Sequence, residues 1–319
     1  MTFTQLRTFI AVVDAGSVHR AAGLLGVTAP AVSGAVGALQ RELGVTLLER
    51  DGRGVRVTGA GTVYAEYARR ILRLTESAGR AAMETLDATR GRVRLAAVTT
   101  AGERVLPPYL ATFRTRFPDA ELSLEVGNRD RVWHALDHDE VDLAIAGRPP
   151  AGGRFASLAA RPNLLVMVAA GSGASSVRDV DVDQLASEVV LMREQGSGTR
   201  STAEQLLDEL GIAPTTLTFS SNGAIRESVG AGLGITLISR DAVARELAAG
   251  TLEEWRCPPL PYERAWHAVT RRNEQLPPTT ALFLDHLVEG GDGGDGLGAG
   301  GPARDGEAAF TLVGPPAPE

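Results

Sequence analysis

A glycine-rich stretch carries a strong chemical signal. Residues 194–200 read Glu-Gln-Gly-Ser-Gly-Thr-Arg, between a predicted strand and a predicted helix. Glycines allow backbone N–H groups to approach a ligand closely, and the start of a helix favours negative charge. The side chains of Ser197, Thr199 and Arg200 would add hydrogen-bond donors. The stretch therefore predicts a site for a carboxylate or phosphate, with a plain strand-to-helix turn as the alternative.

Further polar side chains follow other predicted strands of the same region. Such strand ends gather at one edge of a parallel sheet, where ligands usually bind. The candidate ligand-binding set is Thr99, Thr100, Asn128, Arg148, Glu194, Ser197, Gly198, Thr199, Arg200, Ser221 and Asn222. A dinucleotide site is disfavoured, because Ser201 stands where the third glycine of that fingerprint belongs.

The N-terminal segment has the pattern of a DNA-binding domain. Apolar spacing predicts three short helices before residue 45, and the turn before the third contains Gly26. A hairpin rich in arginine is predicted over 49–58. This layout places one helix in the DNA major groove, whereas a small helical packing domain is the alternative. The residues expected to meet phosphates or bases are Ser17, Arg20, Thr28, Pro30, Ser33, Arg50, Arg53, Arg56 and Thr58.

The charge distribution agrees with a basic front end. Residues 1–91 hold 11 Arg against 8 acidic residues, a balance of +3, while residues 92–319 have a balance of −10. An anionic polymer would therefore meet the N-terminal segment.

Residues 59–89 predict one long helix with a narrow apolar stripe. The stripe consists of Val63, Tyr67, Ile71, Leu74, Ala78, Ala81 or Ala82, and Leu86. A helix of about eight turns with no core of its own to cover is best buried by pairing with a second copy, so we expect a homodimer.

From about Arg92 short apolar runs alternate with helical patterns, which is typical of an α/β fold with parallel sheets. Strands are predicted over 93–98, 121–126, 142–146, 163–169, 189–192, 215–219, 234–238 and 265–270. Helices are predicted over 105–117, 129–138, 199–210, 223–231, 240–248 and 278–288. The stretch 148–154 interrupts this rhythm and suggests two lobes with a ligand between them.

Composition excludes several classes of protein. The single Cys257 cannot form an internal disulfide, and His134 and His138 lack a third ligand for a metal. The N-terminus lacks a signal peptide, and no run of about 18 apolar residues is present. We therefore expect a cytoplasmic chain with no membrane span, no metal, no cofactor and no catalytic residue.

The ordered motifs resemble those of LysR-type transcriptional regulators. The front half contains Ala21-Ala22-x-x-Leu-x-Val-Thr-x-Pro-Ala-Val-Ser33 and Arg56-Val57-Thr58-x-Ala60-Gly61. The second half, including the glycine-rich stretch, is similar to the branch that regulates carbon-fixation operons. Ala29 stands where the family usually has glutamine, so the operator sequence stays open.

The resemblance implies a fold of three parts. These are an all-α winged helix-turn-helix, a linker helix, and an α/β effector domain of two Rossmann-like lobes of the periplasmic-binding-protein type 2. Their predicted bounds are 1–58 for the DNA-binding domain, 59–89 for the linker, 92–289 for the effector domain, with lobe I at about 92–162 and 268–289 and lobe II at about 163–267, and 290–319 for a disordered Gly/Pro-rich tail.

The resemblance also implies partners. We expect homodimers or homotetramers on an interrupted palindromic operator in double-stranded DNA, in contact with RNA polymerase. The ligand set above would bind a small effector, a phosphorylated or carboxylated metabolite, with an aromatic acid as the alternative. The competing interpretation is a cytosolic two-lobed solute-binding module or enzyme, with a helical N-terminal domain for assembly.

Overall fold

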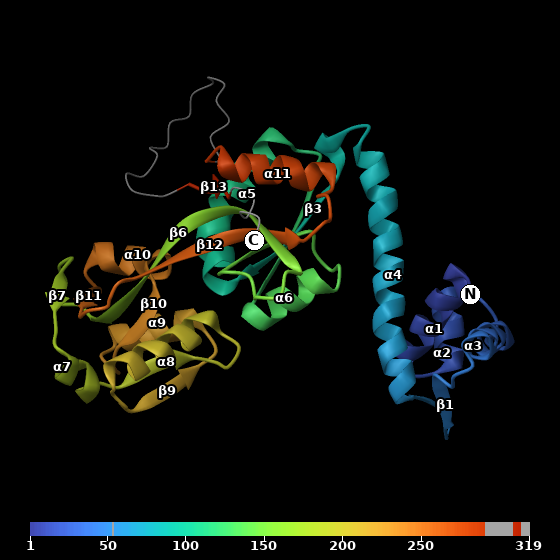
Figure 1. The fold of residues 1–319 in the computed structure, drawn as a ribbon, viewed down its shortest axis with the longest axis horizontal. Coiled ribbons are helices and arrows are strands. Elements are labelled where there is room, and N and C mark those ends of the chain that lie inside the picture. The colour runs from blue at the N-terminus through green and yellow to red at the C-terminus, as the bar shows by residue number, and fades with distance from the viewer. Residues whose placement is uncertain (53, 291–308, 314–319) are drawn as a thin grey trace. The chain divides into compact units, whose positions relative to one another are not determined.

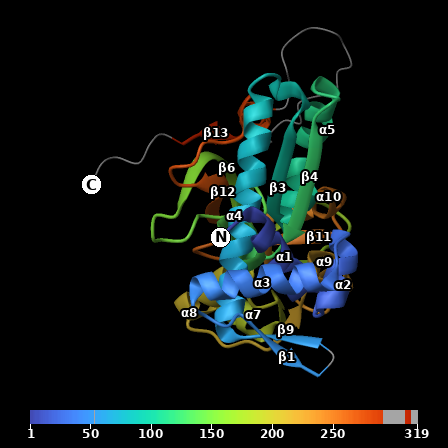
Figure 2. The same cartoon turned by 90° about the vertical axis from the view of Figure 1, so that its right-hand side faces the viewer.

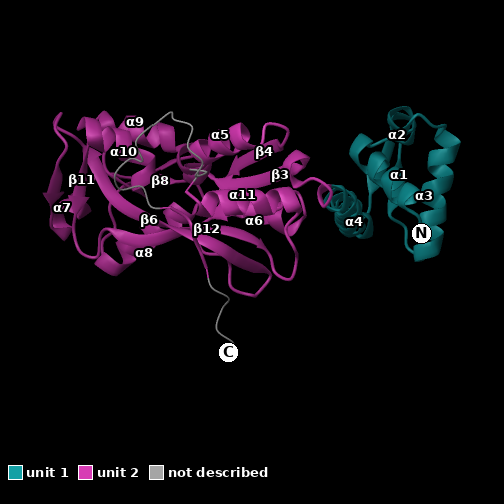
Figure 3. Cartoon of the chain, turned by 90° about the horizontal axis from the view of Figure 1, so that it is seen from above, with its two compact units in different colours: residues 1–83 teal, residues 84–319 magenta. Residues whose placement is uncertain are grey.

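The computed structural model describes residues 1–52, 54–290 and 309–313. The chain divides into two compact units, residues 1–83 and 84–319 (Figure 3). Arg53 of the predicted hairpin and most of the predicted tail lie outside the described residues.

The first unit has three short helices, a hairpin and most of a long helix. These elements are α1 (Phe3–Ala15), α2 (Val18–Leu25), α3 (Ala29–Leu43), β1 (Leu48–Asp51), β2 (Gly54–Val57) and α4 (Gly59–Glu84) (Figure 1). Leu6, Phe9, Val32 and Leu39 form the centre of its core. The three helices and the hairpin therefore occur where the apolar spacing predicts them.

No single helix in the described part of the chain is long and apolar enough to span a membrane. Only α2 and α3, bent by 107° at their break, would pass that test as a pair.

The apolar stripe of α4 is exposed in this single chain. The exposed fractions are 57% for Val63, 63% for Tyr67 and 53% for Leu74. On the opposite side of the helix, Ala65 and Ala68 are buried in the core of the first unit. The helix ends at Glu84, five residues before the predicted end of the linker.

One half of the second unit, lobe I, is built on three parallel strands. They are β4 (Glu121–Gly127), β3 (Arg92–Val98) and β5 (Leu143–Ala146), with β3 between the other two. Strands β3 and β4 lie side by side in Figure 2. On one face, Leu95 packs in a core with residues of α5 (Leu106–Arg116) and α11 (Pro278–Val288). On the other face, Ala96 packs against α6 (Arg129–Asp137).

The other half, lobe II, repeats the alternation of strands and helices. Its strands are β7 (Val177–Asp179), β8 (Val190–Arg193), β9 (Thr216–Phe219), β10 (Thr236–Ser239) and β11 (Leu252–Arg256). Its helices are α7 (Val182–Ser187), α8 (Gly198–Leu210), α9 (Asn222–Gly230) and α10 (Arg240–Ala249). Strands β8 and β9 are parallel.

Two long antiparallel strands connect the lobes. Strand β6 (Phe155–Ala170) pairs with β12 (Tyr262–Arg271) from Arg271 opposite Phe155 to Tyr262 opposite Leu165. Beyond that pairing, β6 joins β10 and β11 in lobe II. The expectation of parallel sheets was therefore incomplete. The prediction of a strand over 163–169 was also too short, because Arg161 and Pro162 interrupt the apolar pattern while the backbone stays extended.

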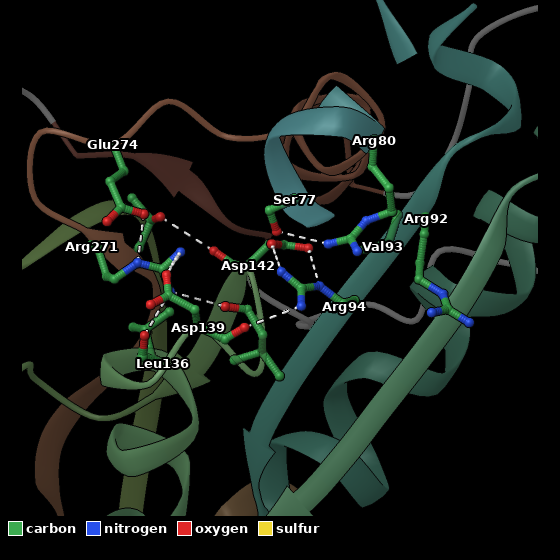
Figure 4. Close-up of polar contacts among 12 residues, drawn as sticks. Ser77, Arg80, Arg92, Val93, Arg94, Leu136, Asp139, Asp142, Arg271 and Glu274 are labelled. Atoms are coloured by element: carbon green, nitrogen blue, oxygen red, sulfur yellow. Dashed lines mark hydrogen bonds and ion pairs between the residues drawn. The ribbon is translucent and has the colours of Figure 1, made fainter. Parts of the chain in front are cut away.

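Two arginines of lobe I are paired with buried aspartates. The guanidinium of Arg94 donates to Asp142, with Nε 2.9 Å from Oδ2, and also to the carbonyl of Asp139 (Figure 4). Arg271 lies 3.0 Å from Asp139 Oδ1 and donates to the carbonyl of Leu136. Both aspartates are buried, so each arginine neutralises a charge that would otherwise be costly inside the fold.

A buried carboxylate anchors the end of α4. Glu84, 5% exposed, accepts the backbone N–H of Arg92 at 3.1 Å and that of Thr279 at 3.2 Å. It thereby connects α4 to the beginnings of β3 and α11. The fit requires glycine at position 91, because a Cβ there would lie 2.1 Å from Thr279 Oγ1.

A C-terminal segment within the predicted tail is ordered. Strand β13 (Thr311–Leu312) pairs antiparallel with β6, and Val313 donates its N–H to Leu158 at 2.9 Å. Phe310 is 1% exposed and meets the ring of Tyr109 edge to face. For these residues the prediction of disorder was wrong, because pairing with β6 is a long-range contact that glycine-rich composition conceals.

We predict that Phe310→Ala lowers the free energy of unfolding of the second unit by about 3 kcal/mol, because it empties a buried aromatic site. Leu312→Ala is the control, since Leu312 is 66% exposed. Urea unfolding followed by tryptophan fluorescence measures both variants, because Trp133, Trp255 and Trp266 all lie in the second unit. Equal losses in the free energy of unfolding of both variants would contradict the role of Phe310 in anchoring this segment.

Burial lowers the pKa of His286 below its ordinary value. The unfolded state then binds a proton at a higher pH than the folded state does, so stability falls as pH drops below about 6.5. We predict that His286→Gln flattens this fall in melting temperature between pH 8 and pH 5. His134→Gln on α6, where His134 is 53% exposed, should keep the wild-type slope.

Candidate functional site

The predicted recognition helix presents a polar, small-residue face. Pro30 and Ser33 are exposed near the start of α3, and Val32 on its other face is buried. Thr28 is the N-cap of α3 and accepts the N–H of Ala31 at 3.4 Å. Its hydroxyl therefore caps the start of α3, whereas the side chain of Ser33 faces solvent.

The hairpin and the helices beside it hold the remaining DNA-binding candidates. Arg20, Arg50 and Arg56 are exposed, and Arg56 forms an ion pair with Glu49. Ser17 is half-buried at the N-cap position of α2, and its side chain makes no capping hydrogen bond to the helix.

Thr58 has a structural role. Its hydroxyl contacts the carbonyl of Thr46 at 2.8 Å and accepts the N–H of Gly61 at 2.9 Å. These bonds connect the hairpin to the start of α4.

Four polar residues meet where the lobes come together. Thr99 and Thr100 follow β3 in lobe I, while Arg193 ends β8 and Asn222 begins α9 in lobe II. Asn222 donates from Nδ2 to Thr100 Oγ1 at 3.0 Å, and Arg193 donates from Nη2 to Thr99 Oγ1 at 3.4 Å. We call these four residues the lobe junction.

Arg193 is the central residue of the lobe junction, and the sequence prediction missed it. Its side chain is only 7% exposed. It donates from Nη1 to Asn222 Oδ1 at 2.6 Å and holds the carboxylate of Glu194 through Nε at 2.7 Å and Nη2 at 2.9 Å. The available signal was an arginine that ends a buried strand directly before the glycine-rich stretch.

Glu194 is charged at neutral pH in this arrangement. Partial burial is the largest single influence and would raise the pKa of Glu194, but the hydrogen bonds from Arg193, a backbone hydrogen bond and the positive charge of Arg193 together hold this pKa below its ordinary value. The pair is therefore a carboxylate and a guanidinium in fork geometry.

The glycine-rich stretch approaches lobe I closely. A Cβ at Gly196, where φ is +82°, would lie 2.6 Å from Asp130 Oδ2 and 3.3 Å from Asn128 Nδ2. Ser197 is buried and begins α8. Both the backbone conformation and the close approach therefore require glycine at 196, so this turn is shaped to bring the start of α8 to the opposite lobe.

Other predicted ligand residues point elsewhere. Arg200 donates to its own lobe, to Arg193 O at 2.9 Å, and pairs with Glu204. Ser221 is exposed and caps α9 through the N–H of Ala224. Selecting polar residues only because they follow predicted strands therefore also selects residues whose side chains have structural roles.

Arg148 follows β5, which runs parallel to β3 in lobe I. Burial and the nearby charge of Arg148 both lower the pKa of His267, whose Nδ1 lies 2.8 Å from Ser157 Oγ. His267 pairs with Ala146 at the end of β5. No pattern in the sequence marked this histidine, because it lies within a strand.

His134 lies on α6, and His138 is the C-cap of that helix. The rings of His134 and His138 stack with centroids 3.8 Å apart. Within residues 1–52, 54–290 and 309–313, no three His, Cys, Asp or Glu side chains are grouped to hold a metal ion.

The chain matches two protein families over most of its length. Residues 3–62 match the "Bacterial regulatory helix-turn-helix protein, lysR family", and residues 87–292 match the "LysR substrate binding domain". The HTH-type transcriptional regulator CbbR of Rhodospirillum rubrum is 37% identical over 285 residues, covering 89% of this chain and 94% of that protein.

Two solved structures are similar in fold. Full-length CbnR complexed with its target DNA has a TM-score of 0.66 and 25% identity, covering 92% of this chain and 100% of that chain. The CcmR regulatory domain of Synechocystis PCC6803 in complex with 2-PG has a TM-score of 0.58 and 30% identity, covering 64% of this chain and 98% of that chain.

We predict that Asn222→Ala lowers the free energy of unfolding by about 2 kcal/mol, because Arg193 and Thr100 each lose a buried hydrogen-bond partner. Urea unfolding monitored by tryptophan fluorescence measures the loss. Gln195→Ala, at an exposed position of the neighbouring turn, should stay within about 0.5 kcal/mol of wild type. If Asn222→Ala left the free energy of unfolding unchanged, the lobe junction would not be formed in solution.

Proposed function

Because the chain belongs to the LysR family of bacterial DNA-binding transcriptional regulators, we propose that a small anionic metabolite, bound at the lobe junction, switches how it binds operator DNA. The observation that carries the proposal is the convergence of donors from both lobes on one buried position. Thr99 and Thr100 come from lobe I, and Arg193 and Asn222 from lobe II.

The ligand class follows from the donors. A guanidinium, hydroxyls and the start of a helix favour a carboxylate or phosphate over a neutral compound. The CcmR regulatory domain with 2-PG (2-phosphoglycolate) supports a small phosphorylated acid. Ser197, Gly198 and Thr199 would bind the anion from the start of α8, and Asn128 would contact it from lobe I.

The DNA partner follows from the first unit. We propose that α3 enters the major groove with Pro30 and Ser33 towards the bases, while arginines of the hairpin meet phosphates. The CbnR structure with target DNA supports this arrangement.

We propose a homodimer or homotetramer paired through the exposed stripe of α4. Two-fold symmetry of the protein would match an interrupted palindrome in the DNA. A contact with RNA polymerase, and action in the cytoplasm beside the chromosome, complete this proposal. The relatives are transcriptional regulators. That the chain itself catalyses no reaction stays a prediction.

Footprinting tests the switch directly. The full chain is used to select binding sites from a random DNA pool, and the selected site is footprinted with and without 2-PG. We expect 2-PG to change the protected length or the hypersensitive positions, because ligand can shift an equilibrium only if it binds the two states differently. An unchanged footprint at saturating 2-PG would reject this ligand, and binding of 2-PG without any DNA binding would favour a solute-binding module.

We predict that the two kinds of DNA contact separate on mutation. Arg50→Ala should weaken binding to operator and random DNA alike and lower the slope of log K against log salt by about 1, because one phosphate contact is lost. Ser33→Ala should instead change the sequences selected from the pool. Arg114→Ala, an exposed arginine of the second unit, is the control. The same loss on both DNAs for Ser33→Ala would contradict its assignment to base contact.

A further inference from the structure

The guanidinium of Arg193 is already occupied by an anion of the same chain. Glu194 contributes both carboxylate oxygens, Oε2 to Nε and Oε1 to Nη2. This is the two-point geometry in which an arginine binds a carboxylate or phosphate of a ligand.

The two partners differ in their burial. The side chain of Arg193 is 7% exposed, whereas that of Glu194 is 27% exposed. A buried guanidinium without a counter-ion is strongly disfavoured, so Arg193 needs an anion whenever the lobes are in this arrangement. Glu194 can turn towards water at a smaller cost, because it is partly hydrated already.

The remaining bonds of Arg193 do not depend on Glu194. Nη1 donates to Asn222 and Nη2 to Thr99, so the guanidinium stays oriented from both lobes when its carboxylate partner leaves. The two hydrogen bonds from Arg193 to Glu194 can thus be exchanged for bonds to another anion, while the guanidinium stays in place.

We propose that Arg193 is the anion-recognising residue of the effector site and that Glu194 is an internal counter-anion, which a carboxylate or phosphate of the effector displaces. The inference rests on the proposed function and assigns how its site is regulated. Glu194 then competes with effector, so it sets the effector concentration at which the regulator responds. The exchange takes place at Arg193, which contacts both lobes, so it can be transmitted to their arrangement.

Removing the competitor should strengthen anion binding. Glu194→Gln keeps the shape of the side chain but removes its charge, so we expect the full chain to bind 2-PG about tenfold more tightly in isothermal titration calorimetry. Arg193→Lys keeps a positive charge but loses the fork, so we expect binding at least tenfold weaker. Glu204→Gln is the matched control, since Glu204 pairs with Arg200 on the more exposed face of α8 and should bind as wild type does.

Inorganic phosphate provides a second probe that does not depend on the natural effector. It should raise the melting temperature of Glu194→Gln more than that of wild type, because the variant leaves Arg193 without its internal anion. A cooperative melting curve of each variant without ligand, compared with that of wild type, confirms that the variant is folded.

The outcomes separate this inference from the proposed function. If 2-PG binds wild type but binds Glu194→Gln equally or more weakly, the ligand class stands and the internal counter-anion is rejected. If 2-PG binds neither protein while phosphate selectively stabilises Glu194→Gln, the counter-anion stands and 2-PG is rejected as the effector. Absence of any anion binding to either protein would overturn both.

Discussion

The arrangement of the two lobes in the second unit depends on the antiparallel pairing of β6 with β12. Each strand begins in one lobe and ends in the other, so the two lobes share a continuous backbone with a fixed register. Arg161 on β6 and Trp266 on β12 both donate to Asp241 at the start of α10. A change in the angle between the lobes must therefore bend two paired strands or alter this buried polar contact.

The lobe junction adds a different kind of constraint, because it is electrostatic and reversible. The bonds from Arg193 to Thr99 and from Asn222 to Thr100 cross between the lobes, so they depend on how the lobes are arranged. The start of α8 approaches lobe I only because position 196 is glycine. Covalent continuity thus positions the lobes approximately, and a few exchangeable hydrogen bonds determine their final arrangement.

Glu84 gives a physical connection between the effector unit and the linker helix. Its carboxylate binds backbone N–H groups at the beginnings of β3 and α11, so Glu84, the last residue of α4, is bound to lobe I. The bonds are to backbone, so they follow movements of the secondary structure and not of single side chains. A displacement of lobe I would therefore move the end of α4 with it.

The sequence by itself determined the elements whose signals are local. Apolar spacing located the three N-terminal helices and glycines located their ends. The turn before α8 was also located, while its role in ligand binding stays a prediction. Family motifs then fixed the order of the domains, and the comparisons confirm the family. These features depend on residues close together in the chain, which is why pattern and propensity were sufficient.

Tertiary structure alone decided the contacts between distant residues. The first half of β6 and the whole of β13 are strands because of their partners, which lie about 100 and 150 residues away in the chain. Orientation decided the site as well, since Arg200 binds within its own lobe while Arg193 contacts both. Two arginines seven residues apart have the same chemistry in the sequence. Only the fold determines which guanidinium is buried between the lobes, because burial depends on packing by residues that are remote along the chain.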